Sequence, residues 1–515
     1  MDELSFYNGI GFKSSPFQYT NADQEENLEK YFIPPPYFQS VWGDPSKPSS
    51  CVIFAPRGGG KSAQRKMIET RSIGSNVLAL QYSRFEFEKG QCIKDIDLDY
   101  HLRNINRLCL LALLMLIYEL EAPCLAFGQI ERAQIRSLCD FYLHDLNSEQ
   151  VISAANSIIP FYEKARDFLK NNLWAISSII ETVFSKIGLP AVKGATSADS
   201  NKINAPSKNH LEIISSLIRT FGKESTYILV DKVDETELTG NDAESSFGLI
   251  EPLIRDLELL QMKNLAFKFF LWDELYPYYK QFARPDRIFQ VQLNWTAAEL
   301  RKMIKLRLQA YSATEEVVNF SDLFDRQMKQ EVKEYAEDLV ITFSHSSPRD
   351  MIRICRQMVT EQLRLDPALD RISGRAITSG FNIFCEDRAK EVVPDQILAE
   401  LQKVHRLDFT VNYVASEVFK VDVNIIRVKI KSWLKTGMVK HIDDIAVQGS
   451  KKLVHHYAVV DSRVAKSIFK ELKFVEFLKS KVRTCSACGV DMFRDWDLSS
   501  DHICQNCKVL FEAEV

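Results

Sequence analysis

The chain of 515 residues has no apolar run long enough to cross a membrane. Its longest run, residues 108–118 (LCLLALLMLIY), falls well short of the roughly 20 residues that a bilayer requires, so it predicts a buried helix. The opening residues, MDELSFYNGIGF, carry an acidic pair and no basic stretch, which argues against a secretory signal. The sequence also lacks internal repeats and low-complexity tracts. A cytoplasmic protein with no membrane partner is therefore expected.

Cysteine is scarce, and the charges largely balance. Of 11 cysteines, seven are scattered singly and four are clustered near the end, which excludes a disulfide framework spread over the chain and fits a reducing compartment. The net charge is only −4, yet residues 420–483 contain 15 lysines and arginines against 6 acidic residues, a local charge of +9. A basic segment on an otherwise acidic chain indicates a module that binds a polyanion.

Short apolar runs separated by helical patterns dominate the first 300 residues or so. Near-continuous hydrophobicity is typical of strands buried on both faces of a parallel sheet, so an α/β layered domain is expected. The runs are 51–55, 77–82, 226–230, 267–271 and 288–293. Between the second and third runs, residues 97–220 predict a helical insertion with one loop at 188–210.

A glycine-rich segment, residues 55–62 (APRGGGKS), follows the first run and opens a helical pattern. Its strand–loop–helix context favours a P-loop over a glycine-rich turn with a chance Lys-Ser pair, and the glycines let backbone amides turn toward phosphate oxygens. Lys61 would neutralise the β and γ phosphates of ATP, and Ser62 would bind Mg²⁺. The predicted nucleotide-binding residues are Ala55, Pro56, Arg57, Gly58, Gly59, Gly60, Lys61 and Ser62, together with Asp231.

Acids stand where the third run ends, in residues 228–235 (ILVDKVDE). Asp231 ends a hydrophobic strand and is expected to be the partner of the P-loop in binding Mg²⁺. A second acid is needed to orient and deprotonate the attacking water, and Glu235 is the choice, with Asp234 as a close rival. Taken alone, the segment also fits a solvated loop.

The form of this strand end resembles the NACHT and KAP branches of the STAND-type P-loop ATPases, relatives of AAA+ proteins, and the resemblance covers about residues 10–390. These families usually have glycine after the first acid, where this chain has Lys232. The opening segment also resembles the lead-in of a group of bacterial P-loop ATPases. The resemblance implies a switch in which ATP closes a helical lid and changes assembly or partner contacts. A role in bacterial defence against phage is a hypothesis by analogy.

Two further motifs are similar to arginine positions of these families. Residues 346–353 (SSPRDMIR) predict a serine-capped helix start and are similar to the GxPR sensor of origin-recognition and STAND ATPases, which would make Arg349 a γ-phosphate sensor. A capping motif with a surface arginine is the alternative. Arg284 and Arg287 precede the fifth run, where AAA+ proteins often carry an arginine finger for a neighbouring subunit, although isolated surface arginines are common. Residues 272–274 (WDE) occupy a sensor position but lack the usual Asn or Thr.

The basic region reads as a winged-helix candidate: helices near 410–418 and 422–436, then strands around 438–448 and 453–460. Arg427, Lys431 and Lys435 recur at i, i+4 and i+8 and form one stripe. Together with Lys451 and Lys452 at the hairpin tip, they could contact DNA phosphates. A solvated charged helix in a protein-interaction module explains the same residues, so both interpretations stay open.

The last motif is a pair of CxxC sequences formed by Cys485, Cys488, Cys504 and Cys507. Two CxxC knuckles 15 residues apart predict a zinc ribbon, which a short polar tail would need in order to fold. His502 is a substitute ligand, and two redox disulfides are the competing interpretation.

The sequence thus predicts an α/β P-loop NTPase core at 1–295, a helical lid at 296–400, a winged-helix-like module at 401–475 and a zinc ribbon at 480–515. The expected cofactors are ATP, Mg²⁺ and Zn²⁺, and the expected partners are a protein effector, DNA through residues 420–483, and further copies in a homo-oligomer or hetero-complex. The predicted function is an ATP-hydrolysing switch. Two other classes stay open: a DNA-binding regulator or initiator-like ATPase, and a nucleotide-gated scaffold that does not hydrolyse ATP.

Overall fold

The computed structural model describes residues 2–120, 127–143, 175–189, 207–314, 318–328, 330–445, 453–459, 461–468, 482–484 and 491–493. The chain folds into two compact units. One is Pro34–Asn294, and the other combines Met1–Ile33 with Trp295–Val515.

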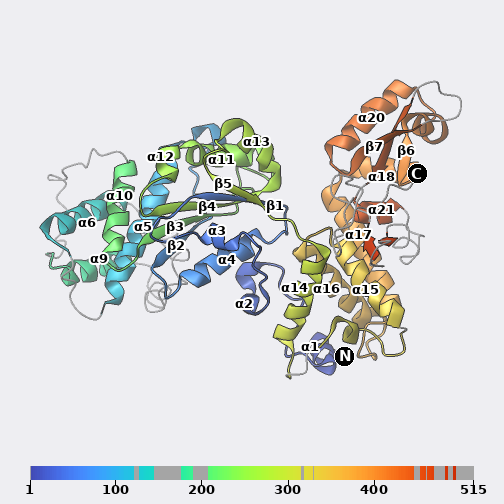
Figure 1. Cartoon of the computed structure of the whole chain (residues 1–515), viewed down its shortest axis with the longest axis horizontal. Coiled ribbons are helices and arrows are strands. Elements are labelled where there is room, and N and C mark those ends of the chain that lie inside the picture. Colours follow the sequence, from blue (N-terminus) through green and yellow to red (C-terminus); the bar gives the residue numbers. More distant parts are fainter. Residues whose placement is uncertain are drawn as a thin grey trace. The chain divides into compact units, whose positions relative to one another are not determined.

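A five-stranded parallel sheet forms the centre of the Pro34–Asn294 unit (Figure 1). Its strand order is β2–β3–β4–β1–β5, and the bounds are β1 Cys51–Ala55, β2 Val77–Tyr82, β3 Ser225–Val230, β4 Leu265–Trp272 and β5 Phe289–Gln292. Every residue of β1 and β3 is buried, as expected for strands covered on both faces. The predicted fold class, an α/β P-loop NTPase core with a parallel sheet, is confirmed.

β5 departs from the prediction that all five runs are buried on both faces. It pairs with β1 at the edge of the sheet, and Phe289 is 43% exposed. The four residues of β5 are exposed or half-buried, whereas those of the other edge strand, β2, are nearly all buried, so the faces of β5 are the less covered ones. Its apolar composition did not distinguish this edge position from a central one.

Helices cover both faces of the sheet (Figure 1). α4 (Lys61–Ser72) packs against β1, β2 and β4, while α11 (Ala243–Arg255), α12 (Leu257–Leu260) and α13 (Tyr276–Phe282) lie on the other side, and α3 (Phe38–Trp42) lies near α4. The predicted insertion contains α5 (Leu98–Glu119), α6 (Gln129–Tyr142), α9 (Ala175–Lys186) and α10 (Ser207–Arg219). The apolar run is indeed a buried part of α5. Among the described residues, no helix is both long and apolar enough to span a membrane. Most of the predicted loop 188–210 lies outside the described residues.

His101 of α5 links the end of β2 to α11. Its Nε2 lies 2.7 Å from the carbonyl oxygen of Leu249, which can only accept, so Nε2 carries the proton. Nδ1 then accepts from the hydroxyl of Tyr82 at 2.9 Å. The ring is fully buried, and burial lowers the pKa of His101 to about 4. At neutral pH the imidazole is therefore uncharged, and its two hydrogen bonds connect the end of β2 to α11.

The first residues of the chain pack in the second unit, with α14 (Ala297–Tyr311). This lead-in contains α1 (Glu3–Ile10) and α2 (Leu28–Tyr31). The buried Arg307 donates to Glu25 Oε2 at 2.7 Å and to the carbonyl of Tyr19 at 2.9 Å, and Tyr311 donates to Glu25 Oε1 at 2.6 Å. The domain boundaries proposed from the sequence placed residues 1–33 in the ATPase core, whereas these buried contacts hold them against α14.

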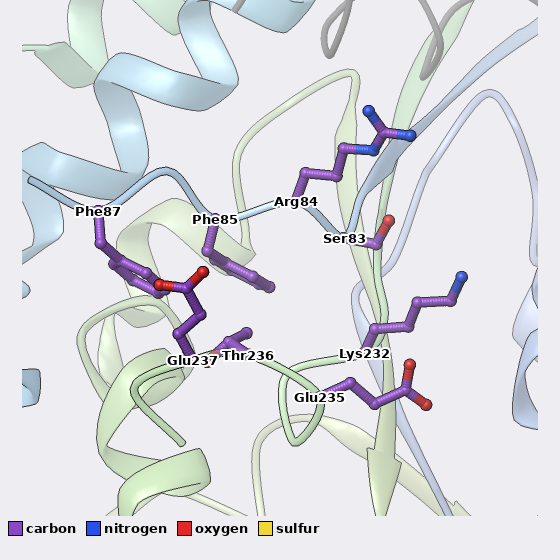
Figure 2. Close-up of a pocket in the computed structure, with 8 residues that line it drawn as sticks. All are labelled: Ser83, Arg84, Phe85, Phe87, Lys232, Glu235, Thr236 and Glu237. Carbon is purple, nitrogen blue, oxygen red and sulfur yellow. The ribbon is translucent and has the colours of Figure 1, made fainter. Parts of the chain in front are cut away.

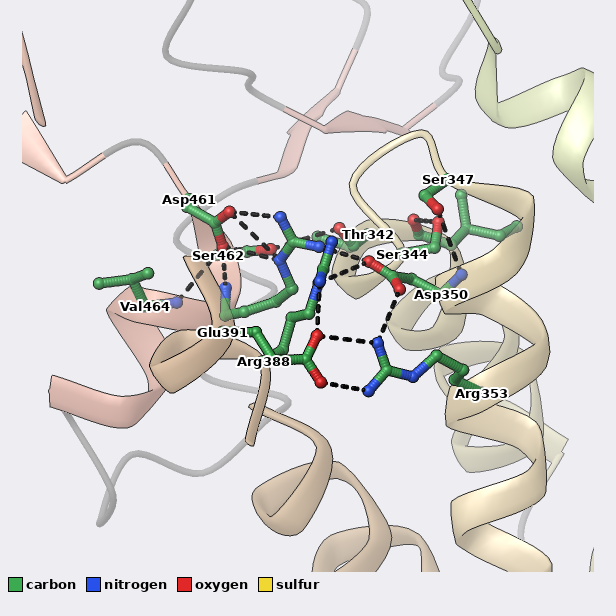
Figure 3. A network of polar contacts seen from close by, with 12 residues as sticks. Thr342, Ser344, Ser347, Asp350, Arg353, Arg388, Glu391, Asp461, Ser462 and Val464 are labelled. Carbon is green, nitrogen blue, oxygen red and sulfur yellow. Dashed lines mark hydrogen bonds and ion pairs between the residues drawn. The ribbon is translucent and has the colours of Figure 1, made fainter. Parts of the chain in front are cut away.

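The region predicted as a lid is helical, with α15 (Gln330–Phe343), α16 (Pro348–Leu365), α17 (Gly374–Val392) and α18 (Asp395–Val404). The predicted serine cap is confirmed: Ser347 Oγ accepts from the amide of Asp350 at 3.2 Å, and Pro348 is the first helical residue. A polar network joins α15, α16 and α17 to α21 (Ser462–Ile468) (Figure 3). In it, the buried Asp350 accepts from Arg463 at 2.6 Å and from Arg388 at 3.1 Å.

A three-stranded antiparallel sheet follows the helical region. β6 (Asp408–Thr410) pairs with β8 (Val454–Val459), which pairs with β7 (Val439–Ile445). Between β6 and β7 lie α19 (Val411–Tyr413), a π-helical turn (Val414–Phe419) and α20 (Val423–Lys435). The helices and hairpin predicted for a winged helix are present, and β6 adds a third strand. Further on, β9 (Val482–Thr484) and β10 (Asp491–Phe493) pair antiparallel.

Candidate nucleotide-binding site

The predicted site residues gather at one edge of the parallel sheet. Since all five strands run the same way, their carboxyl ends meet at a single edge, where open α/β sheets bind ligands. The P-loop leaves β1 there, the acidic segment leaves β3, residues 272–274 end β4, and residues 83–87 follow β2. β4 lies between β1 and β3, so its end stands between the P-loop and the acids.

The backbone of the P-loop requires its glycines. Gly58 (φ +78°) and Gly60 (φ +100°) adopt left-handed conformations. A Cβ on Gly59 would lie 2.9 Å from the carbonyl oxygen of Pro56, so that glycine is needed for close approach rather than for its own φ. Among the described residues, no side chain caps the first turn of α4, which begins at Lys61. The loop and helix start therefore have the form of an anion cradle.

Lys61, Ser62 and Asp231 are brought together at the mouth of this cradle. Lys61 Nζ donates to the carbonyls of Ala55 (2.9 Å) and Pro56 (3.2 Å), folding back over the loop. Ser62 Oγ donates to Asp231 Oδ2 at 3.0 Å, which joins the start of α4 to the end of β3. A hydroxyl and a carboxylate oxygen in contact are the kind of oxygen ligands that Mg²⁺ takes.

Arg65, a residue that sequence reasoning did not select, also holds Asp231. Its Nε donates to Asp231 Oδ2 at 3.0 Å, its Nη1 pairs with Glu69, and its side chain is fully buried. Asp231 is 1% exposed, and its other oxygen accepts from the amide of Lys232 at 2.9 Å. The acid at the end of β3 is thus fixed from several sides. A charged i, i+4 pair on the helix face that also buries Ile68 was the signal available in the sequence.

The two candidate water-activating acids lie in different environments. Asp234 is 5% exposed and accepts from Arg57 Nε at 3.0 Å. The Arg57 guanidinium also stacks 4.0 Å above the ring of Trp272. Glu235 is exposed. The carboxylate of Asp234 is therefore engaged by the P-loop residue Arg57, whereas the carboxylate of Glu235 is accessible to solvent.

Arg57 retains one buried donor. Its Nη2 has no hydrogen-bond partner among the described residues. A buried donor without an acceptor is costly unless a ligand or water satisfies it. Its position in the P-loop makes an anionic ligand a natural partner.

A cavity of about 410 Å³ opens where β2 and β3 end (Figure 2). Lys232, Glu235, Thr236 and Glu237 line it from the loop after β3, facing the segment Ser83–Phe87. Figure 2 shows Glu237 pointing toward Phe87, away from Lys232. Residues 83–87 carried no motif, and only the pairing of β2 with β3 brings them to the site.

A third acid, Asp273, lies near the P-loop lysine. Burial raises the pKa of Asp273, and the nearby Lys61 ammonium opposes this shift. Burial also raises the pKa of Glu274, and the charge of Asp273 adds to it. The sensor position inferred for residues 272–274 therefore contains a carboxyl within electrostatic reach of Lys61.

Of the two predicted arginines, Arg287 lies away from this edge of the sheet. Arg287 is exposed and precedes β5, which runs parallel to β1, so it lies at the edge of the sheet where strands begin. It cannot reach the P-loop of its own chain; among described residues, its ion pair is a 3.4 Å contact with Asp286. Arg349 belongs to the other unit and is exposed on the first turn of α16.

The basic stripe of the winged-helix region is on the surface as predicted. Arg427, Lys431 and Lys435 are exposed on α20, while Ile426, Ile430 and Trp433 are buried behind them. The outer face also carries exposed apolar residues, Ile425 (51%) and Val428 (69%). Lys451, Lys452, and the four cysteines Cys485, Cys488, Cys504 and Cys507 lie outside the described residues.

No protein-family model matches the chain, and no curated protein matches its sequence. Among solved structures, it is similar to that of the Aeropyrum pernix ORC1 protein in complex with DNA. The likeness covers 88% of this chain and 97% of that chain at 11% identity and a TM-score of 0.38. A likeness this distant says nothing about what this chain binds or does. The parallel sheet with a P-loop at its carboxyl edge defines a protein of the P-loop NTPase fold, and membership of the STAND or AAA+ families stays a prediction.

Proposed function

We propose that the protein binds ATP with Mg²⁺, hydrolyses it, and uses its nucleotide state to change contacts with partners. The observation that carries this proposal is the contact of Ser62 with Asp231 beside a glycine cradle. Two oxygens from distant segments meet there next to the P-loop lysine.

The residues fit a phosphate chain and its metal. The cradle supplies oriented amides, Arg57 supplies a buried unpaired donor, and Lys61 can exchange its carbonyl partners for phosphate oxygens. Bound Mg²⁺ would neutralise charge on the phosphates, with Ser62 and Asp231 as its protein ligands. Arg65 would keep Asp231 oriented for that role.

Glu235 is the better candidate for activating water. The proposal assigns it this role because its carboxylate is accessible at the cavity, whereas Asp234 is buried against Arg57. Asp273 would assist from the end of β4, where its carboxyl lies near Lys61.

Phosphate release by purified wild type, Lys61→Ala, Glu235→Gln, Asp234→Asn and Glu237→Gln tests this assignment. Glu237→Gln is the matched control, because it neutralises an acid of the same loop that points away from Lys232. Turnover should disappear in Lys61→Ala and Glu235→Gln and persist in Glu237→Gln. ATP binding without phosphate release under every condition would instead favour a nucleotide-gated scaffold.

DNA binding through α20 is a second proposal, supported by the exposed stripe of Arg427, Lys431 and Lys435. Salt-dependent binding of duplex DNA that is lost on charge reversal of these residues is the expected result. The exposed Ile425 and Val428 support a protein effector instead, and binding to a partner that survives charge reversal would favour it.

The remaining roles are proposed from the sequence. Arg349 as a sensor and Arg287 as a finger supplied to another copy predict slower turnover in the alanine variants, and only Arg287→Ala should be rescued by mixing with Lys61→Ala chains. If residues 480–515 form a zinc ribbon, the wild type should bind one Zn²⁺ there, and the Cys485→Ser variant should lose it. A role in phage defence predicts altered phage sensitivity when the gene is deleted.

A further inference from the structure

Two histidines and an aspartate meet on one face of the β7–β8 hairpin because of a β-bulge. In a regular strand, His441 and Asp444 would point to opposite faces, since they are three residues apart. Here His441 pairs with Tyr457 and Asp443 pairs with His456, so Ile442 is an extra residue that shifts the register. Asp444 then lies opposite His455, and the shift returns it to the face of His441.

The side chains converge on a single oxygen. Asp444 Oδ1 lies 2.8 Å from His441 Nε2 and 2.6 Å from His455 Nδ1. One potential ligand atom from each of the three residues lies within 4.8 Å of the other two. Surface ion pairs usually join two groups and contribute little to stability. Two imidazole nitrogens on one carboxylate oxygen, brought together by a bulge, are a more specific arrangement.

We propose that His441, Asp444 and His455 bind a divalent transition-metal ion of the Zn²⁺, Ni²⁺ or Co²⁺ class. Imidazole nitrogens with one carboxylate oxygen are the ligands these ions share in proteins, whereas Mg²⁺ and Ca²⁺ prefer oxygen alone. The three side chains are 44%, 41% and 63% exposed, respectively, so the ion would keep open positions for water or an external ligand.

Neighbouring residues hold the ligands in place. The ring of Tyr457 lies 5.6 Å from that of His441 and 6.4 Å from that of His455, and Tyr457 is 9% exposed. The two imidazoles meet edge to face at 5.0 Å. Rings fixed by a buried aromatic neighbour lose less freedom when a metal binds. None of its three residues belongs to the P-loop or to the predicted cysteine cluster.

Calorimetric titration of the full chain with Ni²⁺, after loading with one equivalent of Zn²⁺ to occupy any cysteine site, tests the proposal. The variants are His441→Gln, His455→Gln and Asp444→Asn. His456→Gln is the matched control, because this neighbouring histidine of β8 contacts Asp408 at 2.9 Å instead. Circular dichroism checks that each variant is folded.

The wild type should bind one Ni²⁺ per chain, with nitrogen scattering from imidazole in the Ni²⁺ X-ray absorption spectrum. Each ligand variant should bind at least about tenfold more weakly, and His456→Gln should match the wild type. Wild-type protein that takes up no Ni²⁺, or His441→Gln and His455→Gln proteins that bind as tightly as the wild type, would overturn the assignment.

Discussion

Replacing Arg65 by methionine should destabilise the core far more than replacing any exposed arginine. The Arg65 side chain is fully buried between two acids, contacting Asp231 Oδ2 at 3.0 Å and pairing with Glu69. Methionine fills similar space without charge, so Arg65→Met removes the guanidinium from both of these buried ion pairs. Removing one partner of a buried ion pair typically costs about 3–5 kcal/mol.

The lower end of this range applies, because Asp231 keeps the hydroxyl of Ser62 and the amide of Lys232 as donors. We therefore expect Arg65→Met to lower the free energy of local opening by about 3 kcal/mol, on the order of a hundredfold in exchange rate. Arg57→Met is the control: its side chain is 34% exposed, and its loss should cost about 1 kcal/mol.

Hydrogen-exchange mass spectrometry of peptides from α4 and β3 measures the effect where it arises. In the double variant Arg65→Met with Asp231→Asn, the carboxylate that lost the guanidinium is removed as well. Protection of the amides against exchange should therefore be partly restored. Exchange in Arg65→Met that stays within a few-fold of the wild type would refute the reasoning. A double variant whose loss of amide protection equals the sum of the losses in the two single variants would also refute it.

Three further predictions concern other parts of the chain. His101 is neutral in the folded state, where its pKa is about 4, against an ordinary value of 6.5. As the pH falls, the unfolded chain therefore takes up this proton before the folded chain does. The free energy of unfolding should fall between pH 6.5 and 4 by up to about 3 kcal/mol. Urea unfolding followed in the insertion should show this acid loss in the wild type and much less of it in His101→Gln. Arg307→Met should free the lead-in and speed amide exchange of residues 12–31 on the order of a hundredfold, and unchanged exchange would contradict the role of its buried contacts. Lys232→Gly should raise the unfolding free energy by up to about 1 kcal/mol, whereas Lys66→Gly inside α4 should lower it by a similar amount.

Local patterns predicted the elements of the core well, because buried parallel strands and capped helices depend on short stretches of sequence. The P-loop, the acidic end of β3 and the cap at Ser347 all belong to this class. The edge position of β5 was not predictable in this way, because a strand's neighbours are set by topology rather than by its own composition.

The parts of the site that could not be predicted depend on contacts between distant residues. Spacing alone could not separate Asp234 from Glu235, since the difference comes from Arg57, 177 residues away. Residues 83–87 reach the cavity only because β2 pairs with β3. Alternation along β7 would place His441 and Asp444 on opposite faces, and only the bulge reverses that expectation.

Two of the places where this chain departs from the motifs it resembles share one backbone conformation. Glycine is usual after the first acid of β3 and at the start of the GxPR motif, where this chain has Lys232 and Ser346. Both residues have positive φ, 60° and 57°, in the left-handed region that favours glycine. At Lys232 the conformation is held by its amide, which donates to Asp231 at 2.9 Å, so the turn that presents the acid is retained without glycine. Glycine in these motifs is therefore best understood as a marker of backbone geometry. A chain that supplies the same geometry through a side-chain hydrogen bond can keep the turn while losing the residue by which the motif is recognised.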